Sequence, residues 1–151
     1  MALRKIITIG DDLLLKVSRE VEPTDKKTKE LIKDLWDTCR AYEGAGLAAV
    51  QVGLLRRVAV VTDSEQEITL INPKIIKSKG MQEETEGCLS VPDVSGYVER
   101  PEEIVVETQD VNGKAKRYKA EGLLARAICH EMDHMDGVLF TSKMREIEEE
   151  K

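Results

Sequence analysis

The sequence predicts an α+β domain in which antiparallel strands pack around a central helix, with an amphipathic helix nearer the N-terminus. Two observations support this fold class. Apolar residues recur at helical spacing near both ends of the chain, and the stretch between them holds short runs rich in β-branched residues. The 151 residues contain no repeat, linker or low-complexity run, so we expect one domain over residues 1–151.

The first predicted helix covers residues 25–42. Pro23 and Asp25 are start signals, and Gly44 is a stop signal. Apolar side chains recur three and four residues apart in this segment, which predicts one buried face. They are Leu31, Ile32, Leu35, Trp36, Cys39 and Tyr42.

The middle of the chain has the period and composition of strands. Residues 57–62, 68–72 and 104–108 are short, β-branched and bounded by Asp, Asn, Pro or Gly. Asn112-Gly113 predicts a two-residue hairpin turn between the third of these strands and the alternating segment 114–119.

The second predicted helix covers residues 122–136 and ends at Gly137. It carries His130 and His134, the only two histidines of the chain. We expect it to be the central, metal-binding helix of the predicted fold, with the antiparallel strands packed around it.

Composition excludes several classes of protein. The net charge of −6 argues against a nucleic-acid binder, because phosphate contacts need a basic face. No apolar run approaches the roughly 18 residues of a membrane span, and none resembles a signal peptide. We therefore expect a cytoplasmic protein without membrane contact. The odd set of three cysteines then favours thiols or metal ligands over disulfides.

Residues 130–134 read His-Glu-Met-Asp-His. In a helix the two imidazoles project from nearly the same face one turn apart, which suits two ligands of one tetrahedral metal. Glu131 lies at the edge of that face, where it can handle the protons of a water activated by the metal. The alternative is a helix with two surface histidines and a solvated acid.

The third ligand distinguishes between classes of metalloenzyme. A metzincin needs His at position 140, which is Phe140 here, so that class is excluded. A thermolysin-like site needs a downstream carboxylate, but the candidates, Glu146 and residues 148–150, resemble a frayed acidic tail. A thiolate is the better candidate.

Among the cysteines, Cys88 is the best candidate ligand. Cys129 points about 100° away from the histidine face, and Cys39 falls on the buried face of the first helix. Gly87 precedes Cys88 and lets the backbone adopt the conformations of a ligand loop. Cys88 with the two histidines would leave one coordination position open, the pattern of a catalytic site. Taken alone, Cys88 could equally be an inert thiol.

Three blocks in this order resemble the peptide deformylase family: Gly-Ala-Gly-Leu-Ala-Ala-Val-Gln at 44–51, Glu-Gly-Cys-Leu-Ser at 86–90, and the motif at 130–134. The resemblance extends from residues 9–11 to 137–140, nearly the whole chain. It implies that the protein removes the N-formyl group from formylmethionine of nascent bacterial or organellar polypeptides and releases formate. It also implies one divalent metal, usually Fe(II), with Zn, Ni or Co as alternatives.

The resemblance assigns three further roles. Glu131 is implied as the general base and acid that moves protons between the water and the departing amine. The side-chain amide of Gln51 and the backbone N–H of Leu89 are implied as donors to the oxyanion formed at the formyl carbon.

The resemblance also implies where the substrate peptide binds. The backbones of Ala45, Gly46 and Gly87 are implied to line a groove where an extended peptide binds like an added strand. Without the other blocks, the segment beginning at residue 44 would be a glycine turn that leads into an apolar run.

Methionine needs an apolar slot beside the metal. Leu123 and Ala127 lie within about 60° of the histidines on the helix, so we expect them to form its wall, with the stem of Arg126 on the other side. Their alternative role is ordinary core packing. For Arg100, a cation paired with Glu86 near the site and a plain surface charge are both open.

Two other functions remain to be weighed: a metallopeptidase of the His-Glu-x-x-His type, and a catalytically silent peptide-binding relative. Intact Gln51, Cys88 and Glu131 argue against the silent relative, which has no need of the base and the oxyanion donor together. A contact with the ribosome is left open, because the tail after Phe140 is short and mostly acidic rather than basic.

Overall fold

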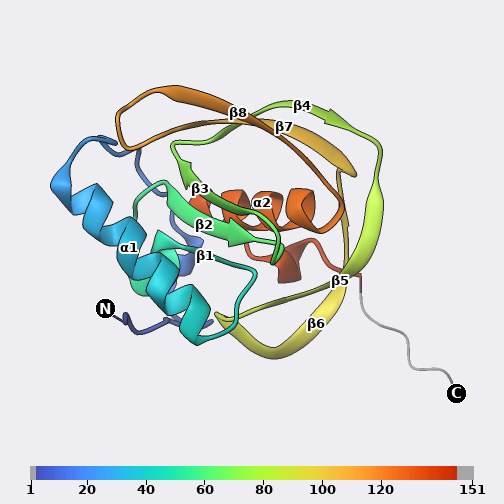
Figure 1. Cartoon of the computed structure of the whole chain (residues 1–151). Coiled ribbons are helices and arrows are strands. Elements are labelled where there is room, and N and C mark those ends of the chain that lie inside the picture. Colours follow the sequence, from blue (N-terminus) through green and yellow to red (C-terminus); the bar gives the residue numbers. More distant parts are fainter. Residues whose placement is uncertain (1–2, 146–151) are drawn as a thin grey trace, which may run out of the picture.

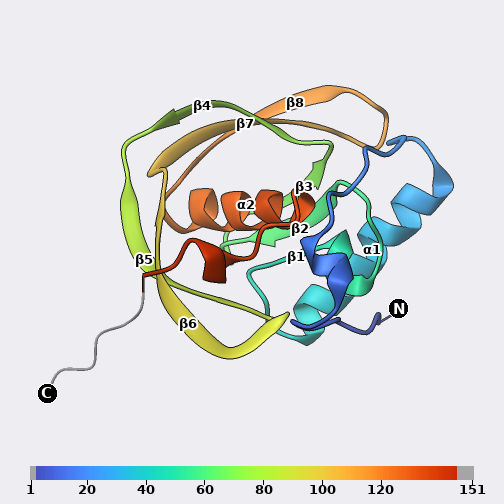
Figure 2. The same cartoon turned by 180° about the vertical axis from the view of Figure 1, so that it is seen from behind.

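The computed structural model describes residues 3–145 (Figure 1). The chain is α+β, with antiparallel strands and two α-helices. Helix α2 (Gly122–Met135) lies in the middle (Figures 1 and 2). The sheet of β4 (Lys74–Lys79), β7 (Glu103–Gln109) and β8 (Ala115–Glu121) lies over it, and the ribbon of β5 (Gln82–Cys88) and β6 (Val91–Arg100) lies on its opposite side. Helix α1 (Lys26–Ala41) and strands β1 (Gly46–Ala48), β2 (Val58–Thr62) and β3 (Glu67–Ile71) complete the side of the molecule nearer the N-terminus. The acidic tail from residue 146 onward, considered above as a source of ligands, lies outside the described residues.

Helix α1 spans Lys26–Ala41, one residue less at each end than the 25–42 predicted. Asp25 caps it by accepting a hydrogen bond from the backbone N–H of Lys27. Leu31, Leu35 and Cys39 are buried and pack with residues of β1 and β2. Tyr42 was predicted on the buried face but is 52% exposed, because the helix has already ended and the chain turns away.

The first sheet has the order β1-β2-β3, with all neighbours antiparallel. Strand β2 is central and its first four residues are completely buried, which explains its unbroken run of Val and Ala. The strands are β1 Gly46–Ala48, β2 Val58–Thr62 and β3 Glu67–Ile71. Strand β1, which the sequence did not predict, is an edge strand.

The second sheet has the order β4-β7-β8. Its strands are β4 Lys74–Lys79, β7 Glu103–Gln109 and β8 Ala115–Glu121. The predicted two-residue turn at Asn112-Gly113 is wrong in length. The loop runs from 110 to 114 and is closed by Asp110, whose Oδ1 accepts hydrogen bonds from the backbone N–H groups of Asn112 and Lys114.

Strands β5 (Gln82–Cys88) and β6 (Val91–Arg100) form a two-stranded ribbon that the sequence did not predict. Strand β5 reads Gln-Glu-Glu-Thr-Glu-Gly-Cys, which has no apolar alternation. In β6 only the second half alternates between buried and more exposed residues, with Gly96, Val98 and Arg100 buried. Because one of these buried residues is an arginine, the alternation does not appear as an alternation of apolar and polar residues.

Helix α2 spans Gly122–Met135 and is buried on most sides. It packs against β1 and β2 on one side and against β7 and β8 on another. Three short 3₁₀ turns complete the described chain: η1 Asp12–Leu15, η2 Ala49–Val52 and η3 Phe140–Ser142. Within residues 3–145, neither α-helix has the length and apolar character needed to span a bilayer.

Candidate active site

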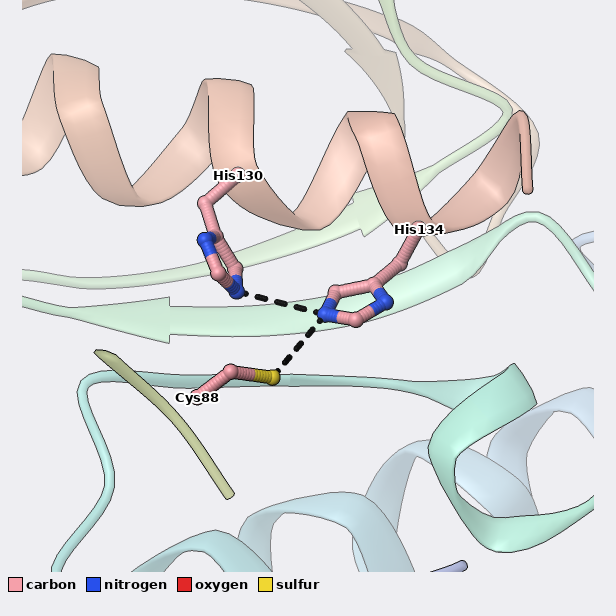
Figure 3. Close-up of side chains that lie close together, drawn as sticks. All are labelled: Cys88, His130 and His134. Carbon is pink, nitrogen blue, oxygen red and sulfur yellow. Dashed lines mark hydrogen bonds between the residues drawn. The ribbon is translucent and has the colours of Figure 1, made fainter. Parts of the chain in front are cut away.

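The structure brings Cys88 together with the two histidines. Cys88 ends β5, and His130 and His134 project one turn apart from α2 (Figure 3). The Sγ of Cys88 lies 3.3 Å from Nε2 of His134, and the Nε2 atoms of the two histidines are 3.2 Å apart. All three possible ligand atoms lie within 4.8 Å of one another. Cys88 therefore meets two histidines that lie 42 and 46 positions further along the chain.

This cluster fits a divalent metal ion by its chemistry. One sulfur and two imidazole nitrogens converge, and such a donor set suits Zn and Fe(II). Burial, together with the nearby His130, lowers the pKa of His134 to about 3, so this imidazole is neutral at physiological pH as a metal ligand must be. Cys39 and Cys129 are buried but do not join the cluster among the described residues.

Glu86 orients His130. Its Oε1 lies 2.9 Å from Nδ1 of His130. Burial alone would raise the pKa of Glu86, but hydrogen bonds from Arg100 and His130 outweigh it and bring the pKa to about 2. Because the carboxylate can only accept, Nδ1 donates the hydrogen bond, and Nε2 is the ring nitrogen that faces the cluster.

Two arginines hold Glu86 in place. Arg100 binds it through two parallel hydrogen bonds of 2.9 Å, and Arg126 pairs with its Oε2 while donating to the carbonyl of Val98. Arg100 also contacts Asp133 at 2.5 Å. The arginines are 3% and 4% exposed, so of the two interpretations of Arg100, the cation paired with Glu86 is correct and the surface charge is wrong.

Glu131 is buried beside the cluster. Its Oε1 has no hydrogen-bond partner among the described residues, although the atom is buried. Burial raises the pKa of Glu131 to about 7, with the charge of Glu86 adding to the rise and that of His130 opposing it. A buried carboxyl group with an unused oxygen and a pKa near neutrality is what proton transfer requires.

The side-chain amide of Gln51 has a defined orientation. Its Oε1 accepts a hydrogen bond from the backbone N–H of Ala48, so its NH₂ group must face the other way. That NH₂ group lies 3.1 Å from Oγ of Ser90 and 3.6 Å from Sγ of Cys88. A donor is therefore directed at the space beside the cysteine. Leu89 follows Cys88 and lines the same space.

A pocket of about 650 Å³ opens beside the cluster. It brings together the residues predicted to touch the peptide: Ala45, Gly46, Gly87, Leu123, Arg126 and Ala127. Leu123 is 58% exposed, so it stands at the mouth of the pocket rather than in ordinary core. The guanidinium of Arg126 is engaged by Glu86 and Val98, as described above.

Sequence reasoning missed the wall of the pocket that the β5–β6 ribbon provides. This wall consists of Thr85, Val91, Asp93, Val94 and Ser95. Its polar strands give no periodic signal, and Asp93 adopts a φ of 65°, which no local pattern announces. The only available signal was the proximity of these residues in the sequence to Cys88.

The edge of β1 faces the pocket with free backbone groups. The N–H of Thr62 donates to the carbonyl of Ala45, and the next pair in the register is Gly46 with Val61. In an antiparallel ladder such pairs alternate, so the N–H and C=O of Gly46 point away from β2. An extended chain can add to this edge.

A buried cluster of one sulfur and two imidazoles, beside an orphaned carboxyl group and a peptide-sized groove, is characteristic of a metal-dependent hydrolase that acts on amides. Comparisons with known proteins narrow this class. The sequence profile described as polypeptide deformylase matches residues 3–150. The chain therefore belongs to the peptide deformylase family, metal-dependent enzymes that remove the N-formyl group from nascent polypeptides.

Individual relatives agree with this assignment. A peptide deformylase of Caldicellulosiruptor bescii is 51% identical over 144 residues, covering 95% of this chain and 87% of its own. The crystal structure of peptide deformylase from Thermotoga maritima superposes with a TM-score of 0.92 at 33% identity, covering 96% and 99% of the two chains. The enzyme of Ehrlichia chaffeensis in complex with actinonin has a TM-score of 0.91 at 37% identity, covering 96% and 90%.

Proposed function

We propose that Cys88, His130 and His134 hold one divalent metal ion, Fe(II) in the native protein, with Zn, Ni or Co able to replace it. Helix α2 is then the central metal-binding helix of a single catalytic domain over residues 1–151, and α1 is its amphipathic N-terminal helix. The convergence of the three donor atoms within 4.8 Å supports this proposal. When bound, the metal lowers the pKa of a water molecule and polarises the formyl carbonyl.

Glu131 acts as general base and then as general acid. Its unpartnered Oε1 is available to accept a proton from the attacking water and to deliver it to the departing amine. Its raised pKa favours both transfers near neutral pH. The role is further supported by its burial, which is the main cause of that raised pKa.

Gln51 and Leu89 stabilise the oxyanion that forms at the formyl carbon. The amide of Gln51 is already oriented with its NH₂ toward Cys88, so no reorganisation is needed during the reaction. The backbone N–H of Leu89 is the second donor. Donors of this kind contribute about 2.7–4 kcal/mol each to transition-state stabilisation.

The substrate binds as an added strand. The free backbone groups of Gly46 at the edge of β1 pair with the peptide, Ala45 and Gly87 flank it, and recognition through backbone atoms lets different nascent chains bind. The methionine side chain enters the pocket between Leu123, Ala127 and the stem of Arg126. These assignments rest on the pocket and on the strand register.

We further propose a cytoplasmic location, with N-formylated nascent peptides as substrates and no membrane partner or readout of nucleic-acid sequence. The ribosome is a candidate partner, with its docking mode open. A metallopeptidase and a silent binding relative are the rival functions, and the first differs in cleaving unformylated peptides.

A direct test separates these functions. The protein is purified anaerobically and assayed for formate release from a formyl-Met peptide and for cleavage of the same peptide without the formyl group. We expect formate from the first substrate, no cleavage of the second, and loss of both metal and activity in Cys88→Ala. Peptide-bond cleavage, or a Cys88→Ala variant with full metal and activity, contradicts the proposal.

A further inference from the structure

Helix α1 ends directly before the edge of the pocket, and its last turn fixes where the groove begins. The N–H of Glu43 donates to the carbonyl of Arg40, and the N–H of Gly44 donates to the carbonyl of Cys39 at 2.9 Å. Together with the φ of 54° at Glu43, these bonds form a Schellman motif. Gly44, the last residue of this motif, already lines the pocket.

The thiol of Cys39 makes a second contact with the same glycine. Its Sγ lies 3.2 Å from the carbonyl oxygen of Gly44. Cys39 is only 1% exposed, and burial raises the pKa of its thiol to about 11, so the sulfur carries its proton and donates. Both backbone polar groups of Gly44 are thus bonded to one residue of α1.

Gly44 and its neighbours touch the reacting region on their other side. A methyl group at Gly44 would lie 3.1 Å from Cδ1 of Leu89, and one at Gly46 would lie 2.6 Å from Oε2 of Glu131. The segment 44–46 is therefore enclosed between Cys39 on one side and the site on the other. A shift of Gly44 would move the edge to which the peptide adds.

We propose that Cys39 is a positioning residue for peptide binding: its backbone carbonyl holds the N–H of Gly44, as any residue at this place would, and its thiol adds the bond to the C=O of Gly44 that fixes the start of the edge strand that receives the substrate. Cys39 touches neither substrate nor metal in this role. The proposal rests on the peptide groove described under the proposed function, and it assigns a task to a thiol that otherwise resembles ordinary core.

Three substitutions separate hydrogen bonding from packing. Cys39→Ser keeps a donor, Cys39→Ala removes the donor and volume, and Cys39→Val fills the space without a donor. We expect KM for a formyl-Met peptide to rise about two- to fivefold in Cys39→Ala and Cys39→Val, the effect of one lost S–H···O hydrogen bond, and to stay near wild type in Cys39→Ser. We expect kcat and metal content to change less than twofold in all three. Cys129→Ser and Cys129→Ala, at a second buried thiol, are the matched controls and should leave KM unchanged.

Infrared spectroscopy detects the hydrogen bond between the thiol of Cys39 and the carbonyl of Gly44 independently of any activity assay. The variant Cys88→Ser/Cys129→Ser leaves Cys39 as the sole thiol, and Cys39→Ser/Cys88→Ser leaves Cys129. We expect the S–H stretch of Cys39 at a lower frequency than that of Cys129, because donation to a carbonyl weakens the S–H bond. An equal or higher frequency overturns the proposal, as does a wild-type KM in Cys39→Val beside a raised KM in Cys39→Ser. Absence of formate release by the wild type would instead refute the proposed function and leave the infrared result interpretable.

Discussion

Gly46 has no room for a side chain, because Glu131 occupies the space where one would stand. A Cβ at position 46 would lie 2.6 Å from Oε2 and 3.1 Å from Cδ of that carboxyl group. The edge strand β1, to which we propose that the peptide adds, is therefore in direct contact with the proposed proton carrier, although Gly46 and Glu131 lie 85 positions apart in the sequence.

This contact predicts the effect of Gly46→Ala. The added methyl group must displace Glu131, so we expect kcat to fall about 10- to 100-fold, in line with a shift of about 1 Å in a catalytic group. Metal content should stay at the wild-type level, since Cys88 and the histidines are not touched. Steady-state kinetics with metal analysis checks this, and a variant with wild-type kcat would show that the position of Glu131 is not critical.

Glu131→Gln keeps the size of the side chain and removes its ability to accept a proton. We expect kcat to fall by about 10²- to 10⁴-fold, the usual contribution of a general base. The metal-to-protein ratio should equal that of the wild type, because the carboxyl group is not proposed as a ligand. Loss of the metal together with activity would instead make Glu131 part of the metal site.

Glu86→Gln tests the buried ion cluster. Removing the carboxylate leaves two arginines that are 3% and 4% exposed without their main partner, so we expect the free energy of unfolding to drop by about 3–5 kcal/mol. The single oxygen of the neutral amide cannot serve Nδ1 of His130 and both arginines, which should also weaken metal binding about 10- to 100-fold.

The control is Glu83→Gln on the same strand. Glu83 pairs with Arg145 at the surface, so its loss should cost less than about 1 kcal/mol. Urea unfolding and metal titration measure both variants. Equal losses in the free energy of unfolding for the two substitutions would mean that the buried ion pairs of Glu86 contribute no more to stability than a surface pair.

The hairpin between β7 and β8 predicts a pH dependence. Hydrogen bonds from the backbone N–H groups of Lys114 and Asn112 lower the pKa of Asp110 below its usual value. Because the folded-state pKa lies below the unfolded one, the stabilisation is fully present above the unfolded pKa of about 3.9 and is lost as the pH falls through the folded pKa. Asp110→Asn should therefore be less stable than the wild type at pH 7, with the difference vanishing in acid. A difference that does not depend on pH would assign the effect to geometry alone.

Sequence patterns predicted those helices and strands in which buried and exposed side chains follow a regular order. Helix α1 is buried on one face, which gives its apolar spacing, and strand β2 is buried on both faces, which gives its β-branched run. These two patterns predicted the bounds of both elements to within one residue at each end. The ribbon of β5 and β6 could not be predicted in this way, because its two strands are mostly polar and show no regular alternation of apolar residues. The ribbon is held by the pairing of β5 with β6 and by buried ion pairs such as that between Arg100 and Glu86. A sequence pattern does not distinguish such a buried charge from a surface one.

The same distinction applies to the site. The spacing of His130 and His134 identified one face of a helix, and elimination selected Cys88, which the structure places beside them. The ion pair between Glu86 and Arg126 spans 40 positions and has no sequence signal, because either residue alone resembles a solvated charge. The contact of Cys39 with Gly44 is equally invisible, since a buried cysteine resembles any small apolar residue.

The optical spectrum of the Co(II)-loaded chain tests the central claim most directly, because Co(II) reports thiolate ligation and geometry together. One Co(II) per chain should give a sulfur-to-cobalt charge-transfer band and the visible absorption of a four-coordinate ion. We expect the charge-transfer band to disappear in Cys88→Ser and to persist in Cys39→Ser and Cys129→Ser. A band that survives in Cys88→Ser, or that is lost with either of the other cysteines, would contradict the metal site proposed here.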